Sequence, residues 1–417
     1  MLEELKRLIQ IPSVTGEDAT VDAPYGQNVK DALVYVLELC DRLGFKTKNC
    51  DNRIGYAEIG EGETLVGILG HLDVVPAGEG WTHNPFDLEI EDGMLYGRGV
   101  VDDKGPLMAS IFAMKDILDS GVKLNKRVRI IFGCQEESGD WDDMSYYLET
   151  EEQPSYGFTP DADFPAIYCE KGIVNIILTL PKPKNIVEIS GGLAVNMVPD
   201  SAKITFINEE GKEETLIVKG KSAHGSVPQD GENAISKLIL EVSDKLDNEF
   251  INFYQQKLGM SIHGELVGCN LKDEASGEIT INVGKIETKE DKIELRLDVR
   301  YPISFTGEVV EELFSKGVKP YEVEVGRVGD TKPVYMDKNG DVMKMLMAAY
   351  EEETGDKTEP LVIGGGTYAR AMPNIIAFGP LLPGREATEH QKNECISESD
   401  LNLCRKIYAE AIKKLMM

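Results

Sequence analysis

The sequence predicts an α/β fold: a mixed sheet with helices on both faces, and a second, α+β domain inserted into it. Strands, loops and helices alternate over residues 1–170, which is typical of a sheet covered by helices. From Gly172 to about Val325 the segments become short and strand-like, with frequent turn signals. A chain of 417 residues also exceeds the usual size of one domain. We therefore expect one domain formed by residues 1–170 and 335–417, and an inserted domain over residues 171–334.

Periodic apolar residues place the individual elements along the chain. An apolar run from Thr64 to Leu69 predicts a buried strand, and a Val/Ile-rich run predicts another at 127–133. Proline favours the first turn of a helix and glycine its end, so Pro106 and Gly121 bound one helix. Helices are expected at residues 1–10, 28–43, 106–121, 233–246, 307–316, 341–350 and 399–415.

The charge of the chain excludes several classes of partner. Asp and Glu number 73 and Lys and Arg 44, which gives a net charge of −29. Such a chain repels phosphate groups, so we expect neither nucleic-acid binding nor binding to anionic membranes. Seven cysteines, an odd number without a CxxC motif, argue against a disulfide framework and favour the reducing cytoplasm. No apolar run is long enough to span a bilayer.

The strand that ends at Leu69 leads into Gly70-His71-Leu72-Asp73-Val74-Val75-Pro76. Residues i and i+2 of an extended segment point to the same side, so His71 and Asp73 can meet where the strand ends. A carboxylate beside a neutral imidazole is a common way to orient a metal-binding histidine. The alternative is a buried core histidine next to a turn aspartate, and this motif alone does not separate the two.

Further ionisable residues also follow predicted strands, where ligands bind in α/β folds. They are Asp102, Asp103, Glu136, Glu137, Asp161, Asp163 and His390. Two imidazoles and several carboxylates suit a site for two divalent metal ions. Nitrogen and oxygen donors favour zinc, and the number of carboxylates leaves manganese or cobalt open. An isolated Glu-Glu pair is usually solvated, but Glu136-Glu137 follows a buried strand and precedes Ser-Gly, which favours a function.

Four motifs in order resemble a known enzyme family over nearly the whole chain. They are the His71–Asp73 motif, Gly97-Arg98-Gly99-Val100-Val101-Asp102-Asp103-Lys104-Gly105, Glu136-Glu137-Ser138-Gly139 and Gly364-Gly365-Gly366-Thr367. The chain is similar to the dinuclear-zinc family of carboxypeptidase G, acetylornithine deacetylase and carnosinase. With Phe158–Pro165 and Glu170-Lys171-Gly172 added, it most resembles bacterial dipeptidases of the peptidase V type. The resemblance implies a zinc exopeptidase-like catalytic domain and a lid, the inserted domain.

The resemblance also implies a role for each residue of the metal site. His71 and Asp161 would hold one metal, Glu137 and His390 the other, and Asp102 would bridge them. Asp73 would orient His71, and Glu136 would be the general base and then the general acid. The choice of Asp102 over its neighbour Asp103 rests on the family pattern, and Asp163 is the alternative to Asp161.

In the lid, the resemblance implies residues that bind substrate. His224, in Gly220–Pro228, would stabilise the tetrahedral oxyanion, and Asn196 would lie near the same site or be an ordinary turn residue. Arg300 would pair with the C-terminal carboxylate of the substrate, unless it forms a structural salt bridge. The backbone N–H groups of Gly364, Gly365 and Gly366 would bind that carboxylate too.

Taken together, the resemblance implies metal-dependent hydrolysis of dipeptides by a metal-bridged hydroxide. The alternative is an N-acyl-amino-acid deacylase that uses the same dinuclear site, and a binding protein without catalysis is a more distant one. The inserted domain is longer than the short lid through which some family members dimerise, which favours a monomer and leaves a homodimer open.

Overall fold

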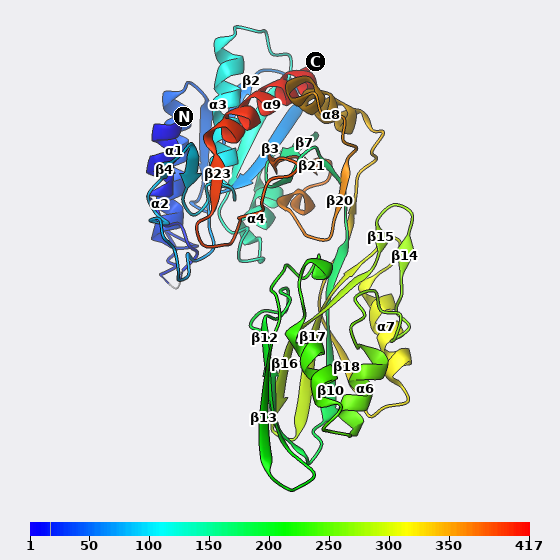
Figure 1. Cartoon of the computed structure of the whole chain (residues 1–417). Helices are drawn as coiled ribbons and strands as arrows, with labels where there is room; N and C mark the ends of the chain where they lie inside the picture. The colour runs from blue at the N-terminus through cyan, green and yellow to red at the C-terminus, as the bar shows by residue number, and fades with distance from the viewer. Residues whose placement is uncertain (17) are drawn as a thin grey trace. The chain divides into compact units, whose positions relative to one another are not determined.

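The computed structural model describes residues 1–16 and 18–417, and the chain divides into two compact units (Figure 1). The first unit comprises Met1–Tyr168, Met336–Leu361 and Thr367–Met417, and the second comprises Cys169–Tyr335 and Val362–Gly366. Each has its own hydrophobic core. The α/β fold class predicted from the sequence is confirmed. None of the helices in the described ranges combines the length and apolar character needed to cross a bilayer.

Within its described residues, the first unit consists of a mixed sheet and six longer helices. The helices are α1 (Leu2–Ile9), α2 (Gln27–Arg42), α3 (Lys104–Asp119), α4 (Asp142–Thr150), α8 (Asp341–Thr354) and α9 (Glu398–Met416). The main strands are β1 (Lys46–Cys50), β2 (Ile54–Gly60), β3 (Leu65–His71), β6 (Arg127–Gly133), β7 (Tyr156–Thr159), β9 (Ile167–Glu170) and β21 (Ile375–Ala377). Shorter elements are β4 (Glu89–Glu91), β5 (Met94–Tyr96), β8 (Ala162–Asp163), β22 (Pro380–Leu381), β23 (Cys395–Ser397) and the 3₁₀ helix η2 (Tyr368–Ala371). Strand β20 (Leu361–Ile363) begins in this unit and ends in the second.

The sheet of the first unit has parallel strands at its centre. Its order is β1-β2-β6-β3-β7-β21-β9, with β6, β3, β7 and β21 parallel to their neighbours in this series. The outer pairs β1–β2, β2–β6 and β21–β9 are antiparallel. Because β3, β6 and β7 run in the same direction, their carboxyl ends lie at one edge of the sheet.

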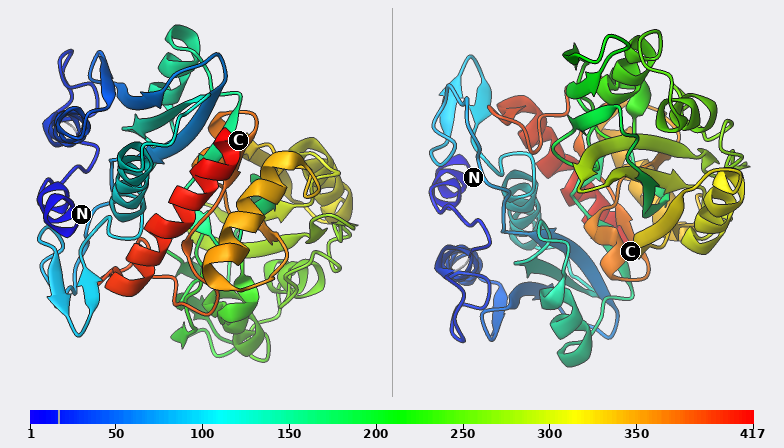
Figure 2. Two further views of the ribbon diagram at one scale, coloured as in Figure 1. Left: turned by 90° about the horizontal axis from the view of Figure 1, so that it is seen from above. Right: turned by 90° about the horizontal axis from the view of Figure 1, so that it is seen from below.

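Helices cover both faces of this sheet. A side chain at Gly55 of β2 would meet Leu33 and Leu37 of α2, whereas Tyr56 packs edge-on against Tyr147 of α4. Successive strand residues point to opposite faces, so α2 and α4 lie on opposite sides of the sheet. On the side of α2, contacts run in series through α1, α3, α9 and α8, and Figure 2 shows α8 and α9 side by side.

The second unit is built on an antiparallel sheet of seven strands, in the order β13-β12-β11-β16-β17-β10-β18. Every residue of one face of β10 is buried, while those of the other face are half-buried apart from the exposed Pro181, so one face packs on the core. The strands are β10 (Gly172–Pro181), β11 (Ile186–Gly191), β12 (Ser201–Ile207), β13 (Glu213–Lys219), β16 (Thr280–Lys289), β17 (Lys292–Tyr301) and β18 (Glu324–Thr331). The unit also contains the helices α5 (Ala234–Val242), η1 (Pro228–Asp230), α6 (Glu249–Lys257) and α7 (Gly307–Val318), and the short strands β14 (Lys272–Asp273), β15 (Gly277–Glu278) and β19 (Val334–Tyr335).

The expected helices all occur, with shifted ends and two additions. The stretch expected as one helix at 233–246 is α5 alone, capped by the Asn233 side chain, and a separate helix, α6, follows after Asn248. Helix α4 was also not expected. One of its three buried residues is Asp143, so its sequence shows little apolar periodicity.

Candidate dinuclear metal centre

The sheet edge of the first unit gathers the residues that the sequence singled out. His71 ends β3, Glu136 and Glu137 follow β6, and Asp161 follows β7. Asp102 precedes the first turn of α3, and His390 lies in the loop between β22 and β23. Because the three strands are adjacent and parallel, their following residues reach the same place without any distortion of the sheet.

Five of these side chains form two groups with the spacing of metal ligands. One group is His71, Asp102 and Asp161, and the other is Asp102, Glu137 and His390. Within each group one ligand atom per residue lies within 4.8 Å of the others. The two groups share Asp102, so its carboxylate has the position of a bridge between two ions.

The two oxygens of Asp102 face different histidines. Oδ1 lies 2.9 Å from His71 Nε2, and Oδ2 lies 2.9 Å from His390 Nε2. His390 Nε2 also lies 3.0 Å from a Glu137 oxygen. Two imidazole nitrogens around three carboxylates are the donor set of a divalent transition metal, and this arrangement fits one ion on each side of Asp102.

The electrostatics of the site also favour bound cations. Burial raises the pKa of Asp161 well above its usual value, and the neighbouring Asp102 carboxylate raises it further. Burial and Asp102 likewise raise the pKa of Glu137. Burial would raise the pKa of Asp102 as well, but hydrogen bonds from His390 and His71 outweigh it and hold that pKa below its usual range. Divalent cations would favour the charged form of all three carboxylates.

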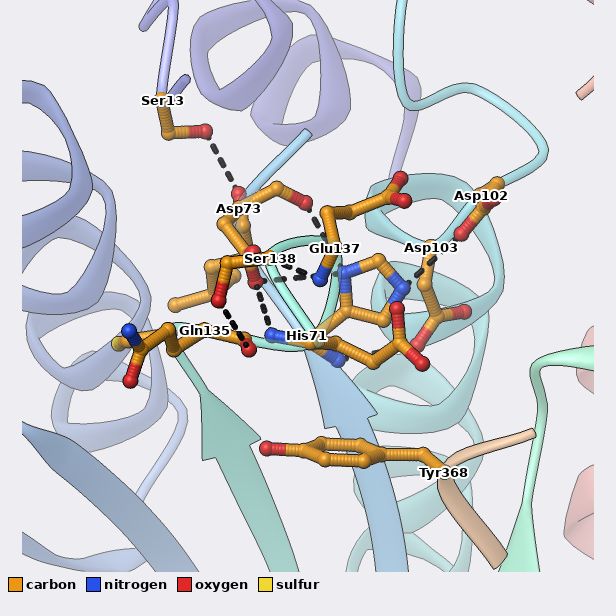
Figure 3. Close-up of polar contacts among 12 residues, drawn as sticks. Ser13, His71, Asp73, Asp102, Asp103, Gln135, Glu137, Ser138 and Tyr368 are labelled. Atoms are coloured by element: carbon orange, nitrogen blue, oxygen red, sulfur yellow. Dashed lines mark hydrogen bonds and ion pairs between the residues drawn. The ribbon is translucent and has the colours of Figure 1, made fainter. Parts of the chain in front are cut away.

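Asp73 connects the histidine to the glutamate loop (Figure 3). His71 Nδ1 lies 2.9 Å from the backbone carbonyl oxygen of Asp73 and 3.5 Å from its carboxylate. The Asp73 carboxylate instead accepts hydrogen bonds from the backbone N–H groups of Glu136 and Glu137, at 3.1 and 3.0 Å. Asp73 therefore orients His71 mainly through its main chain, and its side chain fixes the loop that carries both glutamates.

The Glu136 carboxyl lies in this cluster but belongs to neither ligand group. Burial is the main factor that raises its pKa to about 8, and the Glu137 and Asp102 carboxylates add to the effect while His71 opposes it. A carboxyl group with a pKa near neutrality can both accept and return a proton at physiological pH. This position suits a general base.

A second buried carboxylate, which the sequence analysis did not identify, holds the start of the same loop. Asp143 Oδ2 accepts hydrogen bonds from the backbone N–H groups of Cys134 and Gln135, at 2.7 and 3.2 Å. The Tyr368 hydroxyl also donates to it, at 2.8 Å. The Tyr368 ring packs edge-on against His71, with ring centroids 6.2 Å apart (Figure 3). Four successive backbone amides, at residues 134–137, are thus bound by Asp143 and Asp73.

Glu394, which the sequence analysis also did not identify, binds the backbone of the loop that carries Asp102. Its fully buried carboxylate accepts hydrogen bonds from the backbone N–H groups of Gly99, Val101 and Asp102 and from Arg98 Nη1. It therefore fixes the loop that presents Asp102. A carboxylate that binds main-chain N–H groups leaves no pattern in the sequence. The only local signal was its place four residues after His390.

The residues of the inserted domain that were predicted to bind substrate, Asn196, His224 and Arg300, lie in the second unit. The Gly225 N–H donates to the carbonyl oxygen of Asn196 at 2.7 Å, so the loops of Asn196 and His224 are paired. Asn282 Nδ2 binds the carbonyl oxygens of Val195 and Met197, on either side of Asn196. A Cβ atom at Gly225 would lie 2.5 Å from Asp298 Oδ2, which places the pair Asp298 and Arg300 beside the same loop.

Arg300 is already engaged in this unit. Its Nε and Nη2 donate to the Asp298 carboxylate, and Nη1 donates at 2.8 Å to the carbonyl oxygen of Gly364. A guanidinium has five N–H donors, so one on Nη1 and one on Nη2 lie outside these bonds. The salt bridge therefore orients Arg300 and leaves an edge that could take a carboxylate. Gly364 belongs to the glycine loop expected to bind the same group, and Gly365 and Gly366 follow it.

The pKa values predict how the stability of the metal-free protein depends on pH. The pKa of Glu136 is 4.5 when unperturbed and about 8 in the fold, so the folded state keeps a proton that the unfolded state releases. The free energy of unfolding therefore falls as pH rises from 4.5 to 8. His390 acts in the same direction. Burial lowers its pKa, but Asp102 and Glu137 raise it from 6.5 to about 11, so its stabilisation is complete below 6.5 and declines as the pH rises towards 11.

Urea unfolding of chelator-treated protein at pH 5.5 and pH 8 would measure this effect. We expect the midpoint to be lower at pH 8, and the difference to shrink in Glu136→Gln, which removes one of the groups. An equal difference in both proteins would contradict the assignment to Glu136. Adding zinc or manganese should raise the midpoint mainly at pH 8, where the carboxylates are free to bind.

Comparison with known proteins places this geometry in a family. The sequence model described as Peptidase family M20/M25/M40 matches residues 67–414. The chain is 36% identical over 452 residues to a Bacillus subtilis (strain 168) protein named "Putative dipeptidase YtjP", covering 100% of this chain and 97% of that protein.

Solved structures with low sequence identity share the fold. Human carnosine dipeptidase 1 is 14% identical with a TM-score of 0.62, covering 100% of this chain and 95% of that one. The Bacillus subtilis YXEP protein, described as a dinuclear metal binding peptidase from the M20 family, is 12% identical with a TM-score of 0.52, and the match covers 100% of both chains. Since the family model matches most of the sequence and a full-length relative is more than one-third identical, this chain belongs to peptidase family M20/M25/M40, a family of metal-dependent peptidases.

Proposed function

We propose that this protein is a metal-dependent dipeptidase, which hydrolyses the peptide bond of dipeptides that have a free C-terminal carboxylate. The proposal rests mainly on one observation. Two groups of candidate metal ligands share Asp102, and the neighbouring Glu136 carboxyl group belongs to neither of them. Several relatives are named dipeptidases, which supports dipeptides as the substrate. We also propose a cytoplasmic location, because all seven cysteines are free thiols, and a monomeric state.

We infer that two divalent cations occupy the centre. His71, Asp102 and Asp161 would hold one, and Asp102, Glu137 and His390 the other. Zinc fits the nitrogen and oxygen donors best, and manganese or cobalt is the alternative. When bound, the cations would lower the pKa of a water molecule and polarise the carbonyl group of the substrate.

The protein side chains would then move the proton. Glu136 would accept a proton from the attacking water and return it to the nitrogen of the leaving amine. Its backbone N–H is bound to Asp73, which fixes the main chain from which the carboxyl group extends. Asp73 would at the same time keep His71 in the orientation in which Nε2 faces the metal.

The second unit would supply the groups that recognise substrate. His224 would donate a hydrogen bond to the oxygen on which negative charge develops, with Asn196 on the paired loop beside it. The outer edge of Arg300 and the backbone of Gly364, Gly365 and Gly366 would bind the C-terminal carboxylate. A carboxylate required at a fixed position limits the length of peptide that can be cleaved.

A panel of small amides would test this function. It would compare Ala-Ala, β-Ala-His, Ala-Ala-Ala, Ala-Ala-amide and N-acetyl-alanine, each with zinc, manganese and cobalt. We expect the dipeptides to have kcat/KM values about 10-fold or more above that of Ala-Ala-amide, because the amide lacks the charged carboxylate and a hydrogen bond to a charged group contributes about 1.5–3 kcal/mol. Ala-Ala-Ala should also be a poor substrate, because its carboxylate lies one residue further from the first peptide bond. Preferred cleavage of N-acetyl-alanine would indicate an N-acyl-amino-acid deacylase instead. No hydrolysis of any compound with any metal would contradict a hydrolytic function.

Two matched variants on one strand would locate the carboxylate preference. Arg300 and Arg296 both lie on β17, and each pairs with the acidic residue two positions before it. Lysine keeps the charge but not the planar fork of donors. We expect Arg300→Lys to raise KM for Ala-Ala and to reduce the discrimination against the amide, and Arg296→Lys to change neither. Equal effects of the two substitutions would contradict this role of Arg300.

A further inference from the structure

The His224 ring is exposed, yet its orientation is fixed within its own loop. Nδ1 lies 2.6 Å from the hydroxyl oxygen of Ser226, and it also accepts a hydrogen bond from the Ser226 backbone N–H at 3.3 Å. An exposed histidine usually rotates about its side-chain bonds. Here both contacts come from a residue two positions away, so they persist as long as the loop keeps its shape.

The loop itself is well held. The Gly225 N–H binds the carbonyl oxygen of Asn196 at 2.7 Å, and the Val227 N–H binds the carbonyl oxygen of His224 at 3.0 Å. On the other side, the Val198 N–H binds the carbonyl oxygen of Ala223 at 2.8 Å. Gly225 is also buried, and a Cβ atom there would collide with Asp298. Main-chain hydrogen bonds on both sides of His224 therefore fix the backbone from which Ser226 reaches the ring.

These contacts determine which nitrogen carries the proton. A backbone N–H can only donate, so the 3.3 Å contact favours an Nδ1 that accepts and carries no hydrogen, and the shorter contact to the hydroxyl adds to this preference. In a neutral imidazole the hydrogen is then on Nε2. The Ser226 hydroxyl, which can donate or accept, donates in this arrangement, so both contacts favour the same tautomer.

The main-chain contact of His71 favours the opposite tautomer. Its Nδ1 faces the backbone carbonyl oxygen of Asp73 at 2.9 Å, and a carbonyl oxygen can only accept. The hydrogen of a neutral His71 is therefore on Nδ1, and Nε2 offers a lone pair towards the metal centre. The chain thus prepares one histidine as a metal ligand and another as an N–H donor, through main-chain groups of opposite polarity.

We propose that Ser226 is a positioning residue that holds His224 in the Nε2–H tautomer, so that His224 acts as a neutral hydrogen-bond donor to the substrate. The catalytic part of this proposal rests on the function proposed above, in which His224 stabilises the oxyanion. In this tautomer Nε2 has no lone pair, so His224 neither binds a metal through Nε2 nor removes a proton there. A doubly protonated ring would set its Nδ1–H against the Ser226 N–H, so the backbone contact also opposes the charged form.

Nitrogen NMR would read the tautomer directly. The protein has only five histidines, so labelling with ¹⁵N-histidine gives few signals, and His224→Asn identifies those of His224. In the metal-loaded wild-type protein at pH 8, we expect long-range ¹H–¹⁵N correlations to show a protonated Nε2 and an unprotonated Nδ1. A protonated Nδ1 in that protein would overturn the proposal.

Ser226→Ala tests the contribution of the hydroxyl, and Ser222→Ala, an exposed serine in the same loop, is the matched control. We expect Ser226→Ala to shift His224 towards a mixture of tautomers and to lower kcat for Ala-Ala about 3- to 10-fold, with a smaller change in KM. Ser222→Ala should change neither. The signals of the other four histidines and the metal content show whether the variant is folded.

The outcomes separate this proposal from the function on which it rests. An unchanged His224 tautomer and an unchanged kcat in Ser226→Ala would overturn the role of Ser226. A shifted tautomer with unchanged kcat, together with full activity of His224→Asn, would overturn the catalytic role of His224 itself. Failure of the dipeptide panel with a normal wild-type tautomer would overturn the proposed function and leave the assignment of the Nε2 hydrogen standing.

Discussion

Replacing Glu136 with glutamine is expected to lower kcat by roughly 10²- to 10⁴-fold, the usual contribution of a general acid–base group. Glutamine has the same shape, and its backbone N–H can still bind Asp73, but its side chain cannot accept a proton. Because Glu136 belongs to neither ligand group, the metal content should not change. Steady-state kinetics with Ala-Ala and elemental analysis of the purified protein would measure both quantities.

The matched control for this substitution is Glu149→Gln, an exposed glutamate on α4. It makes the same chemical change at a distance in sequence from the ligand loops and should keep full activity. Activity of Glu136→Gln within about threefold of the wild type would rule out the general-base role. Loss of metal together with activity would instead show that Glu136 is needed to form the centre.

Asp102→Asn should weaken binding of both metal ions, by at least about 100-fold. Groups that only orient a ligand already contribute 10- to 100-fold to metal affinity, and Asp102 is a direct member of both ligand groups. The asparagine keeps the size of the side chain but has one neutral oxygen in place of two charged ones. Titration of metal-free protein with zinc, followed by calorimetry, would give the number of sites and their affinities.

The metal content of Asp102→Asn should be compared with that of His390→Ala, because His390 belongs to only one of the two ligand groups. That variant should keep one ion, whereas Asp102→Asn should keep neither at the same free metal concentration. Asp140→Asn, at an exposed aspartate, controls for the loss of one negative charge. If Asp102→Asn retained one ion with normal affinity, Asp102 would be a ligand of a single metal and not a bridge.

Most of the candidate metal centre could be predicted because its residues follow strands that the sequence marks. His71 and the Glu136-Glu137 pair directly follow apolar strands, and adjacent parallel strands bring such positions together. Asp143 and Glu394 could not be predicted, because each binds main-chain N–H groups, which every residue except proline possesses. Their partners depend on the folded path of a loop and not on side-chain chemistry.

The elements of the fold also differ in how well the sequence predicts them. Long apolar strands and most of the helices were recognised, while α4 and α6 were not. The segment Val362–Gly366 clusters with the second unit although it lies 27 residues beyond Tyr335. This assignment depends on contacts that form only in the folded protein, among them the hydrogen bond from Arg300 to Gly364. The composition of the segment therefore does not predict it.

Asp73 and Asp143, which bind the backbone of the loop that carries Glu136, reduce the reorganisation that catalysis requires. Because the amides of residues 134–137 are all bound to buried carboxylates, the loop is ordered when the protein folds and not when substrate arrives. A preorganised polar environment requires no rearrangement of dipoles as the reaction proceeds. The entropy lost in fixing Glu136 is thus part of the free energy of folding, and the barrier to peptide hydrolysis does not include it.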